Sequence, residues 1–587
     1  MKRFIVLFFA TLGGVVFFTL MLLVLLNRTL LAPPGLPGEF VLELNLEDGL
    51  VEAFPDDPLL MTLERRRLRV RDVVEAIDEA GRDERVRGLL VRGVGGLSGW
   101  GTTEELREAV AGFRATGKAA VVFADTFGEL SPGQLSYYLA TGFDEIYLQP
   151  SGEVGLAPLA VEAPFLRGLL DRYEVLPRFD RREDYKDAVE FLTEREFTSE
   201  AREATTRLLA SLEESLIDAI ASGRDISREM ARVALQEGPY LAREALEAGL
   251  VDRLGYLDEA REGMRERIGD DVDQVALDSY LERGRRGWNR GPRVALVYGV
   301  GSIHRGRSGY DPLTGGSSLG SSTVSNHLRE AAADPSVEAI LFRVDSPGGS
   351  WVASDQVRRE IQRARDGGTP VVVSMGDLGA SGGYVVSMDA DRIVAHPSTF
   401  TGSIGVVAGR LVTRDWFESI GIDWDRVQAS EGTEFYSVVD DFSPEAWERF
   451  QAFLDRIYED FMEGVAEGRG MTVQEVQEVA GGRVWSGRDA ADAGLIDRLG
   501  GFGVALDEIR ELLDLEPGTE LDVALYPEER TLFQLLLEEG RGMGASSTGP
   551  VGELFAVLRP VLRWAAEAGI TEVPGPVLAP NLSVPGR

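Results

Sequence analysis

A serine in a turn of small residues is the first candidate for chemistry. Residues 371–375 are apolar and rich in valine, which predicts a strand, and the chain then runs through GDLGA into Ser381-Gly-Gly-Tyr and an apolar helical run. A hydroxyl at the start of a helix lies where a developing negative charge is favoured, so Ser381 is a candidate nucleophile. The same hydroxyl could instead cap the helix, and the turn alone leaves both roles open.

A second turn, rich in glycine, follows a predicted strand at residues 339–344 and has the sequence DSPGGS at 345–350. Glycine lets the backbone approach a ligand closely and adopt unusual dihedral angles. Bare N–H groups in such a turn can bind the oxyanion that forms when a serine attacks a carbonyl group. An ordinary tight turn is the alternative interpretation.

A serine nucleophile also needs a base that is partly neutral near neutral pH. Histidine is the usual choice, but none of the three histidines lies in these turns, and His396 is expected to be an ordinary loop residue. A buried lysine can serve as the base, whereas arginine stays protonated. Lysine occurs only at Lys2, Lys118 and Lys186; Lys2 precedes an apolar N-terminal run, and Lys118 is expected to be solvated. Lys186 is therefore the candidate base.

The elements that would position these residues alternate between strands and helices. Apolar runs such as residues 119–124 and 371–375 alternate with helical patterns such as 354–365, which predicts an α/β fold with largely parallel sheets. The body is also duplicated. The sequence AGLVDRLG at 248–255 recurs as AGLIDRLG at 493–500, with seven of eight residues identical, and two further matches keep the same order.

The two halves differ in their chemistry. When they are aligned on the repeats, Gln134 of the first half stands opposite Ser381, and the second half contains no lysine to match Lys186. Each half has therefore kept one member of a Ser/Lys pair. A site built from both is expected at the interface of the halves, either within one chain or between neighbouring subunits.

Together these features resemble the signal peptide peptidase A family, also called protease IV, in its long two-domain bacterial form. The resemblance rests on an apolar N-terminal segment, the duplication, and the motifs DSPGG at 345–349, GASGGY at 379–384, TGSIGV at 401–406 and YKDAVE at 185–190. It implies two duplicated domains with a crotonase-like or caseinolytic-protease-like fold after an N-terminal transmembrane helix. It also implies a serine endopeptidase that degrades remnant signal peptides, which are hydrophobic, and that assembles as a homotetramer.

The same resemblance assigns roles to residues of this sequence. It makes Ser381 the nucleophile and Lys186 the general base of a Ser/Lys dyad. Ser403, in the TGSIGV motif, would hydrogen-bond the lysine and hold it near Ser381. The oxyanion N–H groups would come from Gly382 and Gly349, with Gly348 as an alternative to Gly349.

Residues 4–26 are uncharged and almost wholly apolar, long enough at about 1.5 Å per residue to span a bilayer. Because Lys2 and Arg3 precede this run, the N-terminus is expected in the cytoplasm and the body on the periplasmic side of the cytoplasmic membrane. A cleaved signal peptide is the alternative, but the run exceeds the usual length of about 7 to 15 residues and no Ala-x-Ala site follows. The expected units are the anchor at 1–30, a linker at 31–39, α/β repeats at 40–291 and 292–517, and a helical, Pro-rich tail at 518–587.

Composition limits the possible partners. The net charge of −36 argues against binding of nucleic acid, and the absence of cysteine excludes disulfides and thiol chemistry. The sequence contains no phosphate-binding loop and no His–carboxylate cluster, so neither a cofactor nor a metal is expected. The acidic, lysine-poor composition fits either a salt-adapted host or an arginine-rich codon usage.

Two other functions remain open from the sequence. A crotonase-like acyl-CoA enzyme would also use a glycine turn to bind a thioester oxyanion, although an exported body would not meet cytoplasmic acyl-CoA. A non-catalytic membrane scaffold could have kept a protease fold. Labelling by a fluorophosphonate that depends on Ser381 would distinguish a serine protease from both.

Overall fold

A computed structural model describes residues 35–54, 67–269, 272–284, 291–311, 316–430 and 432–527 of the chain. The apolar segment at residues 4–26 and the tail from residue 528 onward lie outside these ranges, so the expected anchor and most of the expected tail stay predictions. Within the described ranges, no helix combines the length and the apolar character that a membrane span requires.

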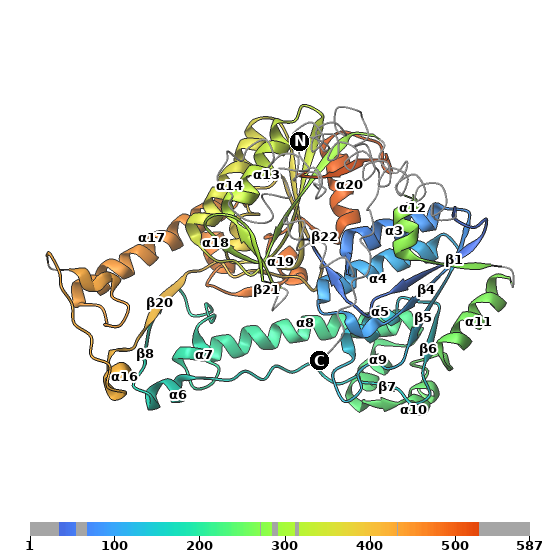
Figure 1. Cartoon of the computed structure of the whole chain (residues 1–587), viewed down its shortest axis with the longest axis horizontal. Coiled ribbons are helices and arrows are strands. Elements are labelled where there is room, and N and C mark those ends of the chain that lie inside the picture. Colours follow the sequence, from blue (N-terminus) through green and yellow to red (C-terminus); the bar gives the residue numbers. More distant parts are fainter. Residues whose placement is uncertain are drawn as a thin grey trace, which may run out of the picture.

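The first half is built on a six-stranded parallel sheet in the order β10-β6-β5-β4-β1-β11 (Figure 1). Its central strands are almost continuously apolar and buried, as in parallel sheets that are covered on both faces. The elements of this half are β1 (Phe40–Asn45), β2 (Leu50–Val51), β3 (Leu68–Arg69), α3 (Val70–Arg82), β4 (Val86–Arg92), α4 (Trp100–Ala115), β5 (Ala119–Ala124), α5 (Gln134–Ala140), β6 (Glu145–Leu148), β7 (Glu153–Val154), α6 (Arg167–Arg172), β8 (Leu176–Arg181), α7 (Glu190–Thr193), α8 (Ser199–Gly223), α9 (Arg228–Glu237), β9 (Tyr240–Leu241), α10 (Ala242–Glu247), β10 (Arg253–Leu254), α11 (Leu257–Ile268), β11 (Asp273–Ala276) and α12 (Leu277–Gly284).

The second half repeats this sheet strand for strand, in the order β22-β18-β17-β16-β12-β23, again with all these strands parallel. Two further strands, β19 and β21, extend it beside the end of β17. Strand β23 lies beyond residue 517, where the sequence analysis ends the second unit. The elements are β12 (Arg293–Val300), β13 (Ser302–His304), β14 (Gly309–Asp311), β15 (Gly316–Gly320), α13 (Ser321–Ala333), β16 (Val337–Ser346), α14 (Trp351–Asp366), β17 (Val371–Ala380), α15 (Gly382–Val385), β18 (Arg392–Ala395), β19 (Phe400–Gly402), β20 (Val407–Val412), α16 (Arg414–Ser419), α17 (Pro444–Arg469), α18 (Val473–Val479), β21 (Val484–Ser486), α19 (Gly487–Asp492), β22 (Arg498–Leu499), α20 (Phe502–Leu512) and β23 (Asp522–Leu525).

The predicted α/β duplication is confirmed down to single hydrogen bonds. A buried tyrosine hydroxyl near the start of α5 donates to a leucine carbonyl at 2.6 Å, and its counterpart after β17 does so at 2.7 Å. An arginine pairs with an aspartate at the same place in both repeats. The matching pairs are Tyr137–Leu250 with Tyr384–Leu495, and Arg224–Asp252 with Arg469–Asp497. These matches set Gln134, the first residue of α5, opposite Ser381.

The halves are joined by the pairing of one strand from each half and by one long helix. Strand β8 of the first half pairs antiparallel with β20 of the second, so that Arg181 lies opposite Val407. Helix α8 then runs along the lower edge of the molecule towards the first half (Figure 1), and its Arg207 forms an ion pair with Asp489 of α19. Because Lys186 follows β8 and Ser403 precedes β20, the pairing of these two strands brings both residues close together.

Candidate active site

Ser381 lies between the end of β17 and the start of α15 in a strained turn. Its φ is 53° and its ψ is −117°, a combination that residues other than glycine rarely adopt. The backbone N–H donates to the Gly402 carbonyl at 2.8 Å, and the side chain makes no capping hydrogen bond to α15. The Ser381 hydroxyl therefore does not cap the helix, which was the alternative that the sequence left open.

Lys186 reaches this hydroxyl from the other half. Its Nζ lies 3.0 Å from Ser381 Oγ, 2.8 Å from Ser403 Oγ and 2.8 Å from the Ser403 carbonyl oxygen. Three contacts match the three N–H donors of a lysine ammonium group. The structure thus brings together Ser381, Lys186 and Ser403, the three side chains that the sequence analysis singles out.

The surroundings of Lys186 favour its neutral form. The residue is 4% exposed, and burial lowers its pKa to about 8, although the neighbouring Asp187 acts in the opposite direction. Among the described residues, no carboxylate forms an ion pair with Nζ. A lysine with this pKa is partly deprotonated near neutral pH, so it can accept the proton of a serine hydroxyl.

The glycine turn after β16 packs against the start of α15. A methyl group added to Gly382 would lie 3.0 Å from the Gly349 nitrogen. In the part of the chain that the structure describes, neither Gly349 nor Gly382 donates its N–H to a protein acceptor. The Gly348 N–H, in contrast, donates to Ser346 Oγ at 3.2 Å. The geometry therefore favours Gly349 over Gly348 as the partner of Gly382 in an oxyanion site.

Sequence comparison identifies the family. The profile of peptidase family S49 matches residues 113–270 and 363–516, one segment in each half. The chain belongs to peptidase family S49. Lys186 lies in the first matched segment and Ser381 in the second.

Relatives of this S49 peptidase extend over most of the chain. Protease 4 of Salmonella typhi is 31% identical over 487 residues, which cover 80% of this chain and 76% of that protein. The chloroplastic serine protease SPPA of Arabidopsis thaliana is 31% identical over 449 residues, covering 75% of this chain and 65% of that protein. Protease 4 of Haemophilus influenzae is 30% identical, covering 77% and 74%. The predicted family and enzyme class are confirmed: the chain is a serine protease.

Among solved structures, ClpP1 of Listeria monocytogenes matches with 17% identity and a TM-score of 0.23, covering 37% of this chain and 95% of that one. A TM-score this low carries no argument. The α/β fold rests on the sheet topology above, and the likeness to the crotonases and the caseinolytic protease stays an expectation.

A glycine pair that the sequence analysis did not single out packs against the backbone of Tyr185 and Lys186 in the S49 peptidase. The Tyr185 N–H donates to the Gly481 carbonyl at 3.1 Å, and the Gly482 N–H donates to the Ile404 carbonyl at 2.9 Å. A methyl group added to Gly482 would lie 2.6 Å from the Lys186 nitrogen, whereas one added to Gly481 would meet only Tyr185, at 3.7 Å. Two adjacent glycines are the only sequence signal for this contact.

The variant Gly482→Ala is expected to lower kcat/KM at least about tenfold, because the added methyl group displaces Lys186 from Ser381. Gly481→Ala is the matched control. The φ angles of Gly481 and Gly482 are 66° and 82°, so alanine at either position carries comparable backbone strain, about 1 kcal/mol. Peptidase assays with thermal melts compare the two variants, and an equal loss of activity in both would assign the effect to strain rather than to the contact with Lys186.

Two residues have surroundings that differ from the sequence-based expectation. His396, expected in an ordinary loop, is completely buried, and its Nε2 lies 3.1 Å from Glu105 Oε2. Although burial acts to lower it, the pKa of His396 is raised to about 10 by the Glu105 carboxylate. Lys118, expected to be solvated, donates from Nζ to the carbonyls of Ala80 and Asp83, at 2.7 Å each. His396 is therefore protonated at neutral pH and has a structural role; it is not a neutral base that could accept the proton of a serine.

Proposed function

We propose that Ser381 and Lys186 form the catalytic dyad of this serine protease, and that it cleaves hydrophobic peptides such as remnant signal peptides outside the cytoplasmic membrane. The observation that carries the proposal is the 3.0 Å contact between Lys186 Nζ and Ser381 Oγ. The pKa of this lysine, lowered by burial to about 8, supports its role as the base.

In the proposed reaction, neutral Lys186 removes the proton from Ser381 Oγ as this oxygen attacks the carbonyl carbon of the scissile peptide bond. The resulting oxyanion accepts hydrogen bonds from the N–H groups of Gly349 and Gly382. Protonated Lys186 then gives its proton to the departing amine, which leaves an acyl ester on Ser381. A water molecule then gives a proton to Lys186 and attacks the carbonyl carbon of the ester. The bond to Ser381 Oγ breaks, Lys186 returns the proton to Oγ, and the acid product leaves.

Ser403 supports this cycle by fixing the lysine. It contacts Nζ through both its hydroxyl and its carbonyl oxygen, at 2.8 Å each. Neither group carries a negative charge, so Ser403 orients the lysine without stabilising the protonated form as a carboxylate would. The base therefore stays both in place and partly neutral.

The substrate and location rest on the sequence and on the family. The apolar run at residues 4–26, preceded by Lys2 and Arg3, supports a single-pass anchor with the catalytic body on the periplasmic side. A body tethered near the bilayer would meet peptides that remain in the membrane after their release from preproteins. These are the remnant signal peptides that the family resemblance implies.

A peptide that cannot cross a membrane tests location and substrate together. Intact spheroplasts carrying the full chain are expected to cleave an added peptide with an apolar centre and a charged tag, and to leave a charge-rich peptide of equal length intact. Spheroplasts carrying Ser381→Ala are the control. Cleavage that appears only after lysis would contradict the location, and preference for the charge-rich peptide would contradict the substrate class.

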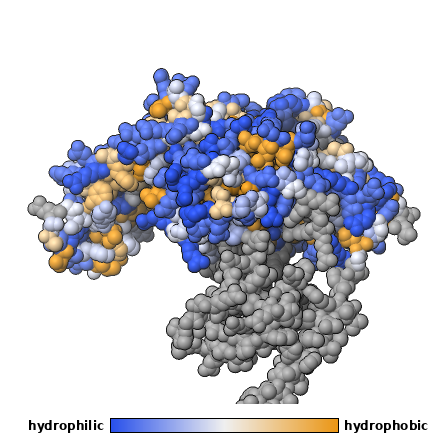
Figure 2. All heavy atoms as spheres, turned by 90° about the horizontal axis from the view of Figure 1, so that it is seen from above, coloured by the Kyte–Doolittle hydropathy of each residue, from blue (hydrophilic) through white to orange (hydrophobic). Residues whose placement is uncertain are grey.

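A homo-oligomer, in the family resemblance a tetramer, is part of the proposal. Apolar side chains gather at the left-hand end of Figure 2, the end of the molecule where Figure 1 places β8 and β20. In the segment between β20 and α17, Val427, Tyr436 and Val438 are 98%, 85% and 74% exposed, and such exposed apolar surface supports a subunit contact. Sedimentation of the full chain in detergent as a monomer would contradict this part.

A further inference from the structure

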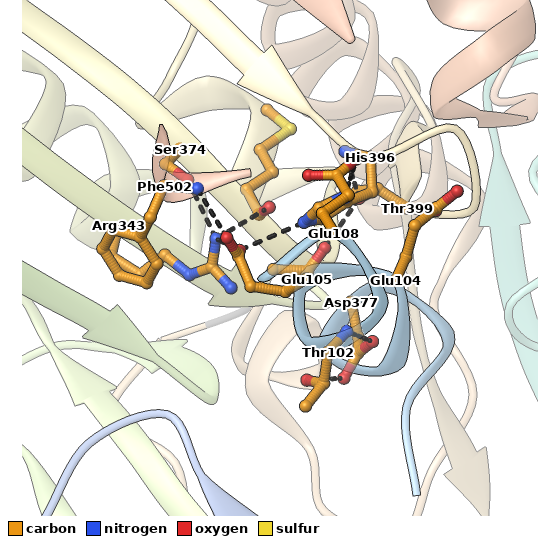
Figure 3. A network of polar contacts seen from close by, with 12 residues as sticks. Thr102, Glu104, Glu105, Glu108, Arg343, Ser374, Asp377, His396, Thr399 and Phe502 are labelled. Atoms are coloured by element: carbon orange, nitrogen blue, oxygen red, sulfur yellow. Dashed lines mark hydrogen bonds and ion pairs between the residues drawn. The ribbon is translucent and has the colours of Figure 1, made fainter. Parts of the chain in front are cut away.

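Helix α4 of the first half reaches into the second half and contacts the segments that lead to the active site. Figure 3 shows this group of polar side chains, with Thr102, Glu104 and Glu105 of α4 facing Asp377, Arg343 and His396 of the second half. The segments concerned are strand β16, strand β17 and the loop between β18 and β19, which lead to the glycine turn, to Ser381 and to Ser403 respectively. One turn of one helix thus contacts every segment from which the second half supplies a group of the proposed site.

The contact with β17 is a helix cap supplied by the other half. The Asp377 carboxylate accepts from the Thr102 N–H at 2.9 Å and from Thr102 Oγ1 at 3.0 Å. Helix α4 has no capping side chain of its own, so Asp377 satisfies a backbone N–H that its first turn would leave open. A methyl group added to Gly99 would lie 1.8 Å from Asp377 Oδ2, so this close approach requires glycine there. Because Asp377 is part of β17, the cap holds the strand that ends at Ser381.

Glu105 makes the contacts with the other two segments. One carboxylate oxygen lies 3.2 Å from Nη1 of Arg343, on β16, and 3.1 Å from Nε2 of His396, after β18. The other accepts from the Phe502 N–H at 2.7 Å and so caps α20 of the second half. Glu105 is 2% exposed, and Arg343 and His396 are completely buried. One carboxylate therefore ties three segments of the second half to a helix of the first.

A buried network of this kind specifies geometry more than it adds stability. Arg343 is further satisfied by Glu52, at 2.8 Å, and by Ser374 Oγ, at 2.8 Å, so each nitrogen of its guanidinium group has an acceptor. His396 Nδ1 makes no hydrogen bond among the described residues and has only the Glu108 carboxylate nearby, at 3.7 Å. Apolar side chains would fill the same space without fixing direction, whereas charged hydrogen bonds hold their partners at set distances and angles. The strands tied in this way, β16 and β17, lead to the glycine turn and to Ser381.

We propose that Thr102 and Glu105 are positioning residues of the peptidase, which set where β16, β17 and the loop before β19 lie relative to Lys186. The inference rests on the proposed Ser381–Lys186 dyad. The first half thus supplies the base, and through α4 it also positions Ser381 and the other groups that the second half contributes to the site.

The test compares kcat with KM in the full-length protein. Thr102→Val, which keeps the backbone bond to Asp377 and removes only the hydroxyl, is expected to lower kcat about tenfold, and Glu105→Gln about a hundredfold, with KM changed less than about twofold. Arg71→Met is the matched control, because Arg71 also bonds across the halves, donating to the Val523 carbonyl at 2.6 Å. It contacts β23, which carries no group of the site, so kcat should stay unchanged even where the melting temperature falls.

Wild-type kcat in folded Thr102→Val and Glu105→Gln would overturn the inference. So would an equal loss of kcat in Arg71→Met and Thr102→Val at equal melting temperatures, because a merely structural contact would act in both. If Glu105→Gln does not fold, Thr102→Val decides alone. Failure of the proposed dyad is distinguishable, since the wild type would then show no Ser381-dependent activity to compare.

Discussion

The variant Ser381→Ala is expected to lose its peptidase activity, with kcat/KM reduced at least about a thousandfold. Without Oγ there is no acyl intermediate, and what remains is the weak catalysis by bound water and the oxyanion donors. The melting temperature should change little, because Lys186 Nζ keeps both of its contacts with Ser403. Covalent labelling by a fluorophosphonate should disappear together with the activity.

Ser387→Ala is the matched control for this loss. The Ser387 hydroxyl donates to the Gly383 carbonyl at 2.7 Å, just beyond the same turn, and is completely buried. This variant removes a hydroxyl and its hydrogen bond without touching Lys186, so it should keep both labelling and activity. Activity and labelling that persist in Ser381→Ala, or vanish equally in Ser387→Ala, would show that Ser381 is not the nucleophile.

The candidate site could be predicted from sequence because its signals are local. Small residues around Ser381 predicted a strand-to-helix turn, and β17 and α15 meet there. Lys186 stood out because lysine is so rare in the chain. The duplication was visible as repeated sequence, and it predicted two parallel α/β sheets, which the structure has.

The distance between the two residues could not be predicted, because it depends on pairing between halves. Strands β8 and β20 bring Lys186 to Ser403, yet neither has the alternating apolar pattern of an obvious strand, and their burial is only partial. The burial of His396 could not be predicted for the same reason. Its partner Glu105 lies far away in the sequence, in the other half, and nothing near a histidine in the chain indicates that a distant carboxylate will bury it.

Lys186 makes stability depend on pH in a definite direction. Burial lowers its pKa in the folded protein to about 8, from 10.5. Between these two values the unfolded chain binds more protons than the folded one, so the free energy of unfolding rises with pH across this window. Below pH 8 the full destabilisation applies, about 3 kcal/mol for a shift of about 2.5 units at about 1.36 kcal/mol per unit.

Lys186→Met is therefore expected to abolish peptidase activity and to raise the melting temperature at pH 7. The free energy of unfolding should rise by up to about 3 kcal/mol, reduced by the contribution of the hydrogen bonds that Nζ makes in the wild type. This gain should shrink as the pH rises from 8 through 10.5, because the wild-type lysine becomes neutral in both states only above this window. Lys186→Arg is the matched variant that keeps the charge. It should be inactive and less stable than the wild type, because arginine cannot release its proton when buried. Melting curves from pH 6 to 11 with parallel assays check both variants; an active arginine variant, or a methionine variant that melts no higher than wild type at pH 7, would contradict a buried, neutral lysine base.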